Sequence, residues 1–410
     1  TKGNSISSIS HILEFIFYLA FLCSTMYKNS NYLNRESRMI KNNRICETFG
    51  IEYPIFLAGM GGAACPKLAA AVSNAGGLGI LGAAACTPSQ MRRWIQETKD
   101  LTDKPFGIDT LLPMSVRSGG NLKQNEGKDP ADLLAEYQKM AKEFMNEHGL
   151  KMVQHDRQPA EEDNLGFFTK EFFEAQMEVV IEEKVPVYAA GLGNPAPWMD
   201  RLRANETKVM TVVGAVRHTI KVSSARVDAI VAQGHDAGGH NSPIGSMALI
   251  PQVVDAANGI PVLGAGGISD GRGIAAAFML GAEGAWIGSA FLASEEADIF
   301  DHQKQAIVDS TEEGTVISRS VTGKPARIIR SAWTDFWERS NLDPLPMPFQ
   351  SGVAGPVLES ANKDQRQDIN PGFAGQGIGM IKSVRPAEEI MADLIEGMER
   401  ALKGSTKMYD

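Results

Sequence analysis

The chain has 410 residues, 43% of them hydrophobic, and a formal net charge of −9 at pH 7. This length and composition predict a globular protein with one large domain, or a large domain with a smaller companion, and exclude an intrinsically disordered chain. The negative charge gives no bulk attraction to nucleic acid or to an anionic membrane surface, so we expect a small-molecule partner and no nucleic-acid partner.

The N-terminal segment, residues 1–38, is predicted to be an extension outside the fold. Its apolar run ILEFIFYLAFLCS, residues 12–24, is shorter than the roughly 20 residues that span a bilayer. A signal peptide would need a basic stretch before the run, and only Lys2 is present there. Membrane association through this run therefore stays a minor alternative.

The cysteines indicate the redox environment. All four, Cys23, Cys46, Cys65 and Cys86, lie in the first quarter of the chain without C-x-x-C spacing. This usage predicts neither a zinc site nor a disulfide framework, and it fits a reducing, cytoplasmic location.

From Tyr53 onward, short apolar runs alternate with stretches of helical length and spacing. Eight such alternations over about 250 residues predict a parallel (β/α)8 TIM barrel of the α/β class. A doubly wound open sheet is the alternative. The predicted strands are 54–60, 78–83, 105–112, 186–192, 208–214, 227–234, 261–268 and 284–292. The predicted helices are 66–76, 88–101, 169–184, 195–205, 216–226, 243–258 and 271–281.

The alternation sets the expected domain limits. The barrel domain is predicted over residues 39–310, with a polar elaboration at 114–170 that contains one helix near 129–149. After residue 310 the alternation stops, and aromatic residues mix with prolines. We therefore expect a small, mainly helical cap or substrate domain over 311–384. A last helix, within 385–410, is expected to pack back on the barrel.

Glycine dominates the predicted strand ends, where a barrel carries its chemistry. The seventh strand ends in AGGISDG, with Ala265, Gly266 and Gly267 before a helix that starts near Asp270, and the eighth ends in Gly288 and Ser289. Bare backbone amides on neighbouring loops beside a helix N-terminus favour a phosphate. The alternative is that these glycines only permit tight turns. The GxGxxG at Gly77, Gly79 and Gly82 lacks the strand and helix of a dinucleotide site.

The sixth strand is followed by AQGHDAGGHNSPIG, residues 232–245. Gln233 can both donate and accept hydrogen bonds to a ring with alternating N–H and C=O groups. Gly238 and Gly239 permit close approach to a flat ligand, and His240 can serve as a base near neutrality. Metal binding by His235, Asp236 and His240 is the weaker reading, because the spacing matches no standard ligand set, and we expect no metal.

The run QGHDAGGH and the following MALIPQVVDAANGIPVLGAGGISDGRGIAAAFMLGAEGAWIGSAFLAS resemble the nitronate monooxygenase family, formerly called 2-nitropropane dioxygenases. The resemblance extends from about Ile45 to Lys403 and includes PIFLAGMGG, LAAAVSNAGGLGILGA, KPFGID and the late GQGIGMI. It implies a (β/α)8 barrel that binds FMN noncovalently and holds no metal. The implied flavin-binding residues are Gly59, Met60, Gly61, Asp109, Gln233, Gly238, Gly239, Ala265, Gly266, Gly267, Trp286, Ile287, Gly288 and Ser289, and the implied catalytic base is His240.

The reaction implied by the resemblance is the oxidation by O2 of an alkyl nitronate, or of a nitroalkane after proton removal, to a carbonyl compound and nitrite. Two positions depart from relatives. Val212 stands where some carry a lysine, and Asp109 where many carry an asparagine. Alternatives are an NAD(P)H-dependent FMN quinone or enoyl-thioester reductase, a flavin-free barrel enzyme acting on a phosphorylated metabolite, and a non-enzymatic flavin-binding scaffold.

Overall fold

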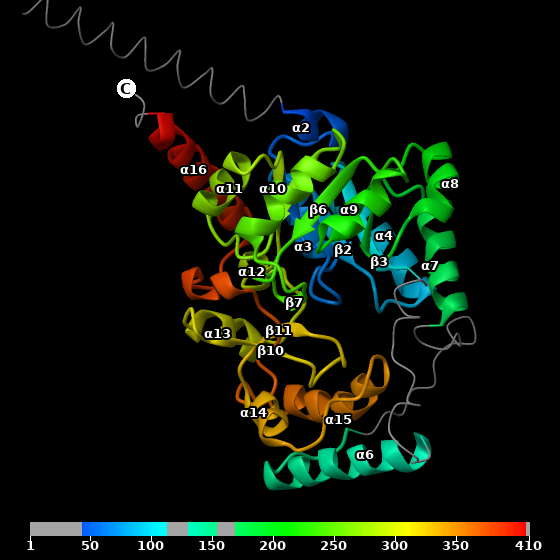
Figure 1. The fold of residues 1–410 in the computed structure, drawn as a ribbon, viewed down its shortest axis with the longest axis vertical. Coiled ribbons are helices and arrows are strands. Elements are labelled where there is room, and N and C mark those ends of the chain that lie inside the picture. The colour runs from blue at the N-terminus through cyan, green and yellow to red at the C-terminus, as the bar shows by residue number, and fades with distance from the viewer. Residues whose placement is uncertain (1–42, 113–129, 154–168, 407–410) are drawn as a thin grey trace, which may run out of the picture. The chain divides into compact units, whose positions relative to one another are not determined.

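The computed structural model, which describes residues 43–112, 130–153 and 169–406, contains a parallel barrel (Figure 1). Eight parallel strands lie in the order β1-β9-β8-β6-β5-β4-β3-β2. A parallel bridge between Phe56 and Leu78 brings β1 beside β2, so the sheet closes on itself. The predicted barrel is confirmed, and the open sheet is excluded. The strands are β1 (Ile55–Leu57), β2 (Gly79–Gly82), β3 (Phe106–Leu111), β4 (Val187–Leu192), β5 (Lys208–Val213), β6 (Ala229–Gln233), β8 (Val262–Ala265) and β9 (Gly284–Ile287).

Helices connect the strands where the apolar spacing predicts them. Thr87 and Thr169 cap their helices by accepting from a backbone N–H three residues on, and Asp270 accepts from the N–H groups of Arg272 and Gly273. Each cap satisfies an N–H that the first helical turn leaves without a partner. The connecting helices are α3 (Pro66–Asn74), α4 (Pro88–Leu101), α7 (Lys170–Glu182), η3 (Ala196–Trp198), α8 (Met199–Ala204), α9 (Val216–Ser223), α10 (Ser246–Ala256) and α11 (Gly271–Met279).

The eighth strand is shorter than predicted. It ends at Ile287, and the second half of the predicted run forms the short helix α12 (Ser289–Leu292). Periodicity could not separate the two halves, because a short run of buried apolar residues fits either a strand or a helix. The consequence is a sharp turn at Gly288 on the edge where the barrel carries its loops.

Apolar side chains from the strands fill the barrel, with the short helix α2 (Arg44–Phe49) packed against them. Phe49 meets Phe56 edge to face, with ring centroids 5.3 Å apart. Met210, Val231 and Leu263 are fully buried in the same cluster. Each such side chain stabilises the fold by roughly 1.5–3 kcal/mol relative to an exposed one, and the packed interior leaves chemistry to the strand ends.

Three helices outside the barrel form a second cluster, rich in aromatic residues. Helix α6 (Pro130–Glu147), from the segment between β3 and β4, contacts α15 (Phe349–Lys363). Phe144 lies against Trp333 of helix α14 (Ala332–Arg339), with ring centroids 5.0 Å apart. The segment after residue 310 also contains strands that the sequence did not predict. In these, β10 (Thr315–Ser318) pairs with β11 (Ala326–Ile329), which pairs with β7 (Gly239–His240).

The last helix, α16 (Ala387–Thr406), contacts α11 and α3 of the barrel. A Cβ atom on Gly271 would lie 2.0 Å from the backbone nitrogen of Met398, so the two helices approach through a glycine. The predicted extension, residues 1–38 with the apolar run at 12–24, lies outside the described residues. Within the described ranges, no helix is both long and apolar enough to cross a membrane.

Candidate active site

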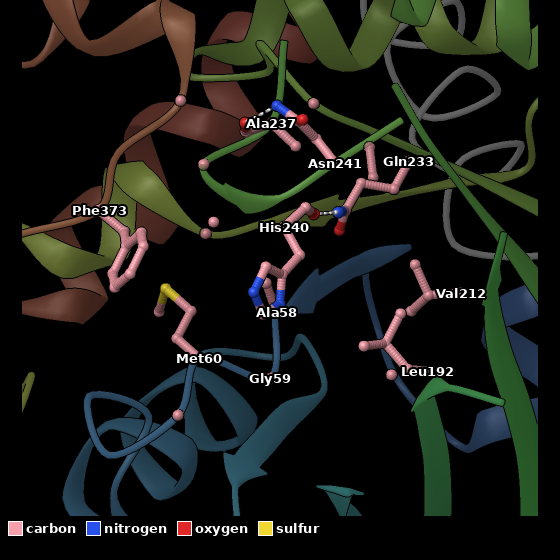
Figure 2. A pocket seen from close by; sticks show the side chains of 18 of the residues that line it. Ala58, Gly59, Met60, Leu192, Val212, Gln233, Ala237, His240, Asn241 and Phe373 are labelled. Atoms are coloured by element: carbon pink, nitrogen blue, oxygen red, sulfur yellow. Dashed lines mark hydrogen bonds between the residues drawn. The ribbon is translucent and has the colours of Figure 1, made fainter. Parts of the chain in front are cut away.

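A cavity of about 1270 Å³ lies at the carboxyl ends of the barrel strands. Its walls come from the loops after the strands, from the β10–β11 hairpin and from residues 370–377. Figure 2 shows the His240 ring between Met60 and Phe373 on one side and Val212 and Leu192 on the other. The volume exceeds the roughly 300–1,000 Å³ of most small-molecule sites, so a cofactor and a substrate fit together.

The loops after β8 and β9 form a cradle of backbone N–H groups, which we define as Gly266, Gly267, Gly288 and Ser289. Strand pairing sets Ala265 opposite Trp286, so the two loops begin side by side. Gly266 and Gly267 have φ values of +96° and +73°, which disfavour any side chain. Among the described residues, none accepts a hydrogen bond from these four N–H groups. Neighbouring backbone N–H groups of this kind favour an anion such as phosphate.

Residues 370–380, which we call the strap, lie against the cradle. The N–H of Gly375 donates to Oγ of Ser289 at 2.8 Å, and the N–H of Gln376 donates to the carbonyl of Asp236 at 2.8 Å. A Cβ atom on Gly377 would lie 2.4 Å from Oγ of Ser269. Because no side chain fits between them, the strap holds the loops after β6 and β8 by backbone contact.

The loop after β6 is held by side chains. Gln233 donates from Nε2 to the carbonyl of His240 at 2.8 Å (Figure 2). Arg327 on β11, only 5% exposed, donates from Nε and Nη2 to the carbonyl of His235 at 3.2 and 3.0 Å. The imidazole of His235 lies 2.9 Å from the carbonyl of Ser242 through Nδ1. His235 therefore has a structural role in the loop.

Gly238 and Gly239 differ from each other within this loop. A Cβ atom on Gly238 would lie 2.7 Å from the carbonyl carbon of Ala374, so Gly238 is required by the strap. Gly239 has a φ of +70° and open space around its Cα. The close approach predicted for a ligand is thus, at Gly238, already made by the protein's own backbone.

His240 is placed by this loop with its ring in the cavity. Its Nε2 lies 2.8 Å from Oγ1 of Thr322, in the loop between β10 and β11. Burial, together with the positive charge of Lys324, lowers the pKa of His240 to about 4. The imidazole is therefore neutral near pH 7, and one of its nitrogens can accept a proton.

Asp109 lies at the end of β3, wedged between two glycines. A Cβ atom on Gly59 would lie 2.2 Å from Oδ2 of Asp109, and one on Gly191 would lie 2.5 Å from its Oδ1. Burial raises the pKa of Asp109 well above its usual value, although a hydrogen bond from the backbone of Gly191 opposes the shift. A carboxyl that keeps its proton at this position presents an O–H donor, as the amide of an asparagine presents N–H donors.

The cavity brings together the residues that the sequence predicts, with one exception. Ile287 is buried in β9, and its carbonyl accepts from the N–H of Ala58 at 2.8 Å. The ligand-binding and catalytic roles themselves stay predictions. The predicted residues that line the cavity are Gly59, Met60, Gly61, Asp109, Gln233, Gly238, Gly239, His240, Ala265, Gly266, Gly267, Trp286, Gly288 and Ser289.

Several residues that line the cavity were not predicted from the sequence. Thr322 and Lys324 line the cavity from a hairpin that lies 82 and 84 residues beyond His240, and nothing in their local sequence marks them. The strap did carry a signal, because PGFAGQGIG has four glycines in nine residues. Among the residues that the structure describes, no three His, Cys, Asp or Glu side chains gather as metal ligands.

Sequence comparisons with known proteins indicate one family. The family model described as nitronate monooxygenase matches residues 42–397. A Mycobacterium tuberculosis protein named as a monooxygenase is 37% identical over 368 residues, which cover 86% of this chain and 95% of that protein. A Staphylococcus aureus protein named as a nitronate monooxygenase is 30% identical over 376 residues, covering 89% and 99%.

Two solved structures resemble most of the chain. A nitroalkane oxidase from Streptomyces ansochromogenes superposes with a TM-score of 0.72 at 28% identity, covering 88% of this chain and 99% of that one. FabK from Thermotoga maritima superposes with a TM-score of 0.68 at 30% identity, covering 90% and 99%.

Proposed function

Because this chain belongs to the nitronate monooxygenase family, and is thus an oxidoreductase, we propose that it binds FMN in the cavity and oxidises alkyl nitronates with O2. Nitroalkanes enter the same reaction after proton removal, and the products are a carbonyl compound and nitrite. One observation carries the proposal. A neutral histidine ring and a cradle of N–H groups without protein acceptors border the same large cavity.

The residues of the cavity fit FMN. The cradle of Gly266, Gly267, Gly288 and Ser289 has the N–H groups that a phosphate needs, and none of the four has an acceptor among the described residues. Gly59 and the buried carboxyl of Asp109 line the same cavity as the cradle. Bound there, FMN supplies the redox chemistry between substrate and O2, and the protein supplies binding, orientation and electrostatics.

Several side chains have defined tasks in this proposal. His240 accepts the proton from the carbon that bears the nitro group, and the electron pair of the broken C–H bond stays on the substrate as the nitronate. Gln233 holds the backbone of His240 through its carbonyl. The apolar side chains of Met60, Leu192 and Phe373 border the cavity beside the ring and restrict water around it.

A reductase on the same scaffold is the second candidate, with NAD(P)H as reductant and a quinone or an enoyl thioester as acceptor. The observation in its favour is the likeness to solved structures that are not named as nitronate monooxygenases, FabK among them. An enoyl reductase domain superposes with a TM-score of 0.61, but at 12% identity this indicates the fold alone. Fast NAD(P)H oxidation without nitronate turnover would favour this candidate.

The test is purification with FMN, followed by oxygen-uptake assays with ethylnitronate and with nitroethane. We expect an absorbance band near about 450 nm, where oxidised flavin absorbs, oxygen uptake with both substrates, and nitrite release. His240→Asn should lower kcat/KM for nitroethane by about 100-fold or more, because a positioned general base contributes 10²–10⁴-fold.

The control is His148→Asn, the same substitution in a histidine that stacks on Phe144 outside the cavity. We expect it to keep wild-type kcat/KM, and both variants should retain the flavin band. A His240→Asn variant with undiminished nitroethane turnover would contradict the assigned base. Wild-type protein without a flavin band after FMN reconstitution would contradict the cofactor.

A further inference from the structure

A residue of the β10–β11 hairpin, Thr322, holds the ring of His240 in one orientation. Its backbone lies in β7, where it pairs with Ala326 of β11, and its carbonyl accepts from Gln233. Its Nε2 meets Oγ1 of Thr322 at 2.8 Å. No hydrogen bond within the described part of the chain engages Nδ1. The two nitrogens of one imidazole therefore have different surroundings.

The loop that carries Thr322 is held by hydrogen bonds and close packing. Arg319 donates from Nε to the carbonyl of Gly323 at 3.0 Å, and the N–H of Gly323 donates back to the carbonyl of Arg319 at 2.9 Å. A Cβ atom on Gly323 would lie 2.3 Å from the carbonyl oxygen of Leu345, so the loop packs tightly against the backbone of residues 345–347. The position of Thr322 is therefore set by its own loop, so that its hydroxyl can orient the imidazole of His240.

The hydroxyl of Thr322 has a second hydrogen-bonding neighbour, Lys324, toward which its hydrogen points. Oγ1 donates its one hydrogen to the carbonyl of Lys324, and it accepts from the N–H of Lys324, both at 3.4 Å. A hydroxyl has one hydrogen and two lone pairs. With its hydrogen directed to that carbonyl, Oγ1 accepts from His240, and this arrangement assigns the proton to Nε2.

We propose that Thr322 is a positioning residue that fixes His240 in its Nε2–H tautomer and so leaves Nδ1 as the proton acceptor. In the proton transfer, the C–H bond next to the nitro group breaks, its electron pair stays on the substrate as the nitronate, and the proton bonds to Nδ1. Nε2 keeps its hydrogen throughout, so Thr322 accepts from it before and after the transfer. No other group has to move.

The kinetic test of this inference rests on the proposed function. It compares two substrates, because a preformed nitronate needs no base whereas a nitroalkane does. Thr322→Val keeps the shape of the side chain and removes the acceptor. We expect the ratio of kcat/KM for nitroethane to that for ethylnitronate to fall about tenfold or more, since a mispositioned base loses part of its 10²–10⁴-fold contribution. Thr322→Ser, which keeps the hydroxyl, should restore the ratio to within about twofold.

The second arm reads the tautomer directly by long-range ¹H–¹⁵N correlation spectra of protein with ¹⁵N-labelled histidine. The signal of His240, one of seven histidines, is identified by its loss in His240→Asn. We expect protonated Nε2 in the wild type and in Thr322→Ser, and protonated Nδ1 or a mixture in Thr322→Val. A wild-type Nδ1–H tautomer would overturn the inference, as would an equal loss of both activities in Thr322→Val. If the wild type oxidises neither substrate, the proposed function fails while the spectra still decide the tautomer.

Discussion

The two sides of the cavity are built from different material. On the side of β8 and β9, the cradle consists of backbone N–H groups, with glycines where a Cβ atom would meet its neighbours. On the side of β6, His240 is placed by side chains from elsewhere in the chain, namely Gln233, Thr322 and, through the carbonyl of His235, Arg327. The cradle side depends on backbone N–H groups, and the His240 side depends on the functional groups of side chains.

This difference follows from what each side has to do. A phosphate keeps its charge throughout a reaction, so fixed backbone dipoles suit it and need no adjustment. A base must change its protonation, and its pKa and tautomer are set by burial and by hydrogen bonds from specific groups. We therefore expect substitutions in the cradle to act on cofactor affinity, and substitutions around His240 to act on catalysis and local stability.

The largest effect is expected from Gly266→Ala in the cradle. Its φ of +96° disfavours alanine, and the new Cβ atom would lie 2.7 Å from Oγ of Ser246, so the loop has to move. We expect FMN affinity, measured by quenching of flavin fluorescence, to fall about 100-fold or more, equivalent to about 2.7 kcal/mol.

The matched control is Gly259→Ala. Gly259 has a φ of +81° with no neighbour within 4 Å of a Cβ atom, and it lies outside the cavity. Both variants should lose about 1 kcal/mol of folding free energy from the backbone alone. Only Gly266→Ala should lose FMN, and equal affinities in the two variants would show that the cradle does not hold the phosphate.

An intermediate effect is expected from Arg327→Met. The substitution removes the two donors to the carbonyl of His235 and one to Oγ1 of Thr315. We expect a loss of about 1.5–3 kcal/mol in the free energy of unfolding by urea, the range for hydrogen bonds of charged groups. Turnover of nitroethane should fall several-fold, because the loop that carries His240 loosens, while the cradle and FMN affinity stay intact.

Arg330→Met is the control for that prediction. Arg330 lies just beyond β11, and its half-exposed side chain forms ion pairs with Asp335 and Glu338 at 2.7 and 3.0 Å. Exposed pairs contribute about 0–1 kcal/mol, so this variant should remain near the wild type. Similar losses in the two variants would mean that the contact of Arg327 with the loop has no special weight.

The same contrast explains what could be read from the sequence. Gly266 and Gly267 were predictable because their positive φ favours glycine. Gly288 was predictable because a βα turn after an apolar run is recognisable in the sequence. His240 was predictable from its position after β6. Thr322 and Arg327 were not, because they reach His240 only through the pairing of β7 with β11, and a two-residue strand leaves no periodic pattern.

Asp109 belongs to neither side, and its substitution should have the smallest effect on function. Asp109→Asn replaces a buried carboxyl, whose pKa is raised by burial, by an amide of the same shape between Gly59 and Gly191. We expect FMN affinity and turnover at pH 7 to stay within about threefold of the wild type, because both side chains present a donor there. The stability should respond more clearly than the activity.

Burial raises the pKa of Asp109 in the folded protein, whereas the unfolded chain releases the proton near its usual pKa of about 3.9. Above that pH the folded state binds more protons than the unfolded state, so this group destabilises the fold increasingly as pH rises toward the folded pKa. Asp109→Asn should therefore be more stable than the wild type to urea at pH 7, and the difference should shrink toward zero as the pH falls to about 3.9. The exposed Asp200→Asn in α8 controls for the loss of one carboxylate and should show no such convergence. If the difference in free energy of unfolding between Asp109→Asn and the wild type stays constant with pH, the carboxyl of Asp109 is ionised in the folded protein. The carboxyl could then not act as a donor in the way that an asparagine amide does.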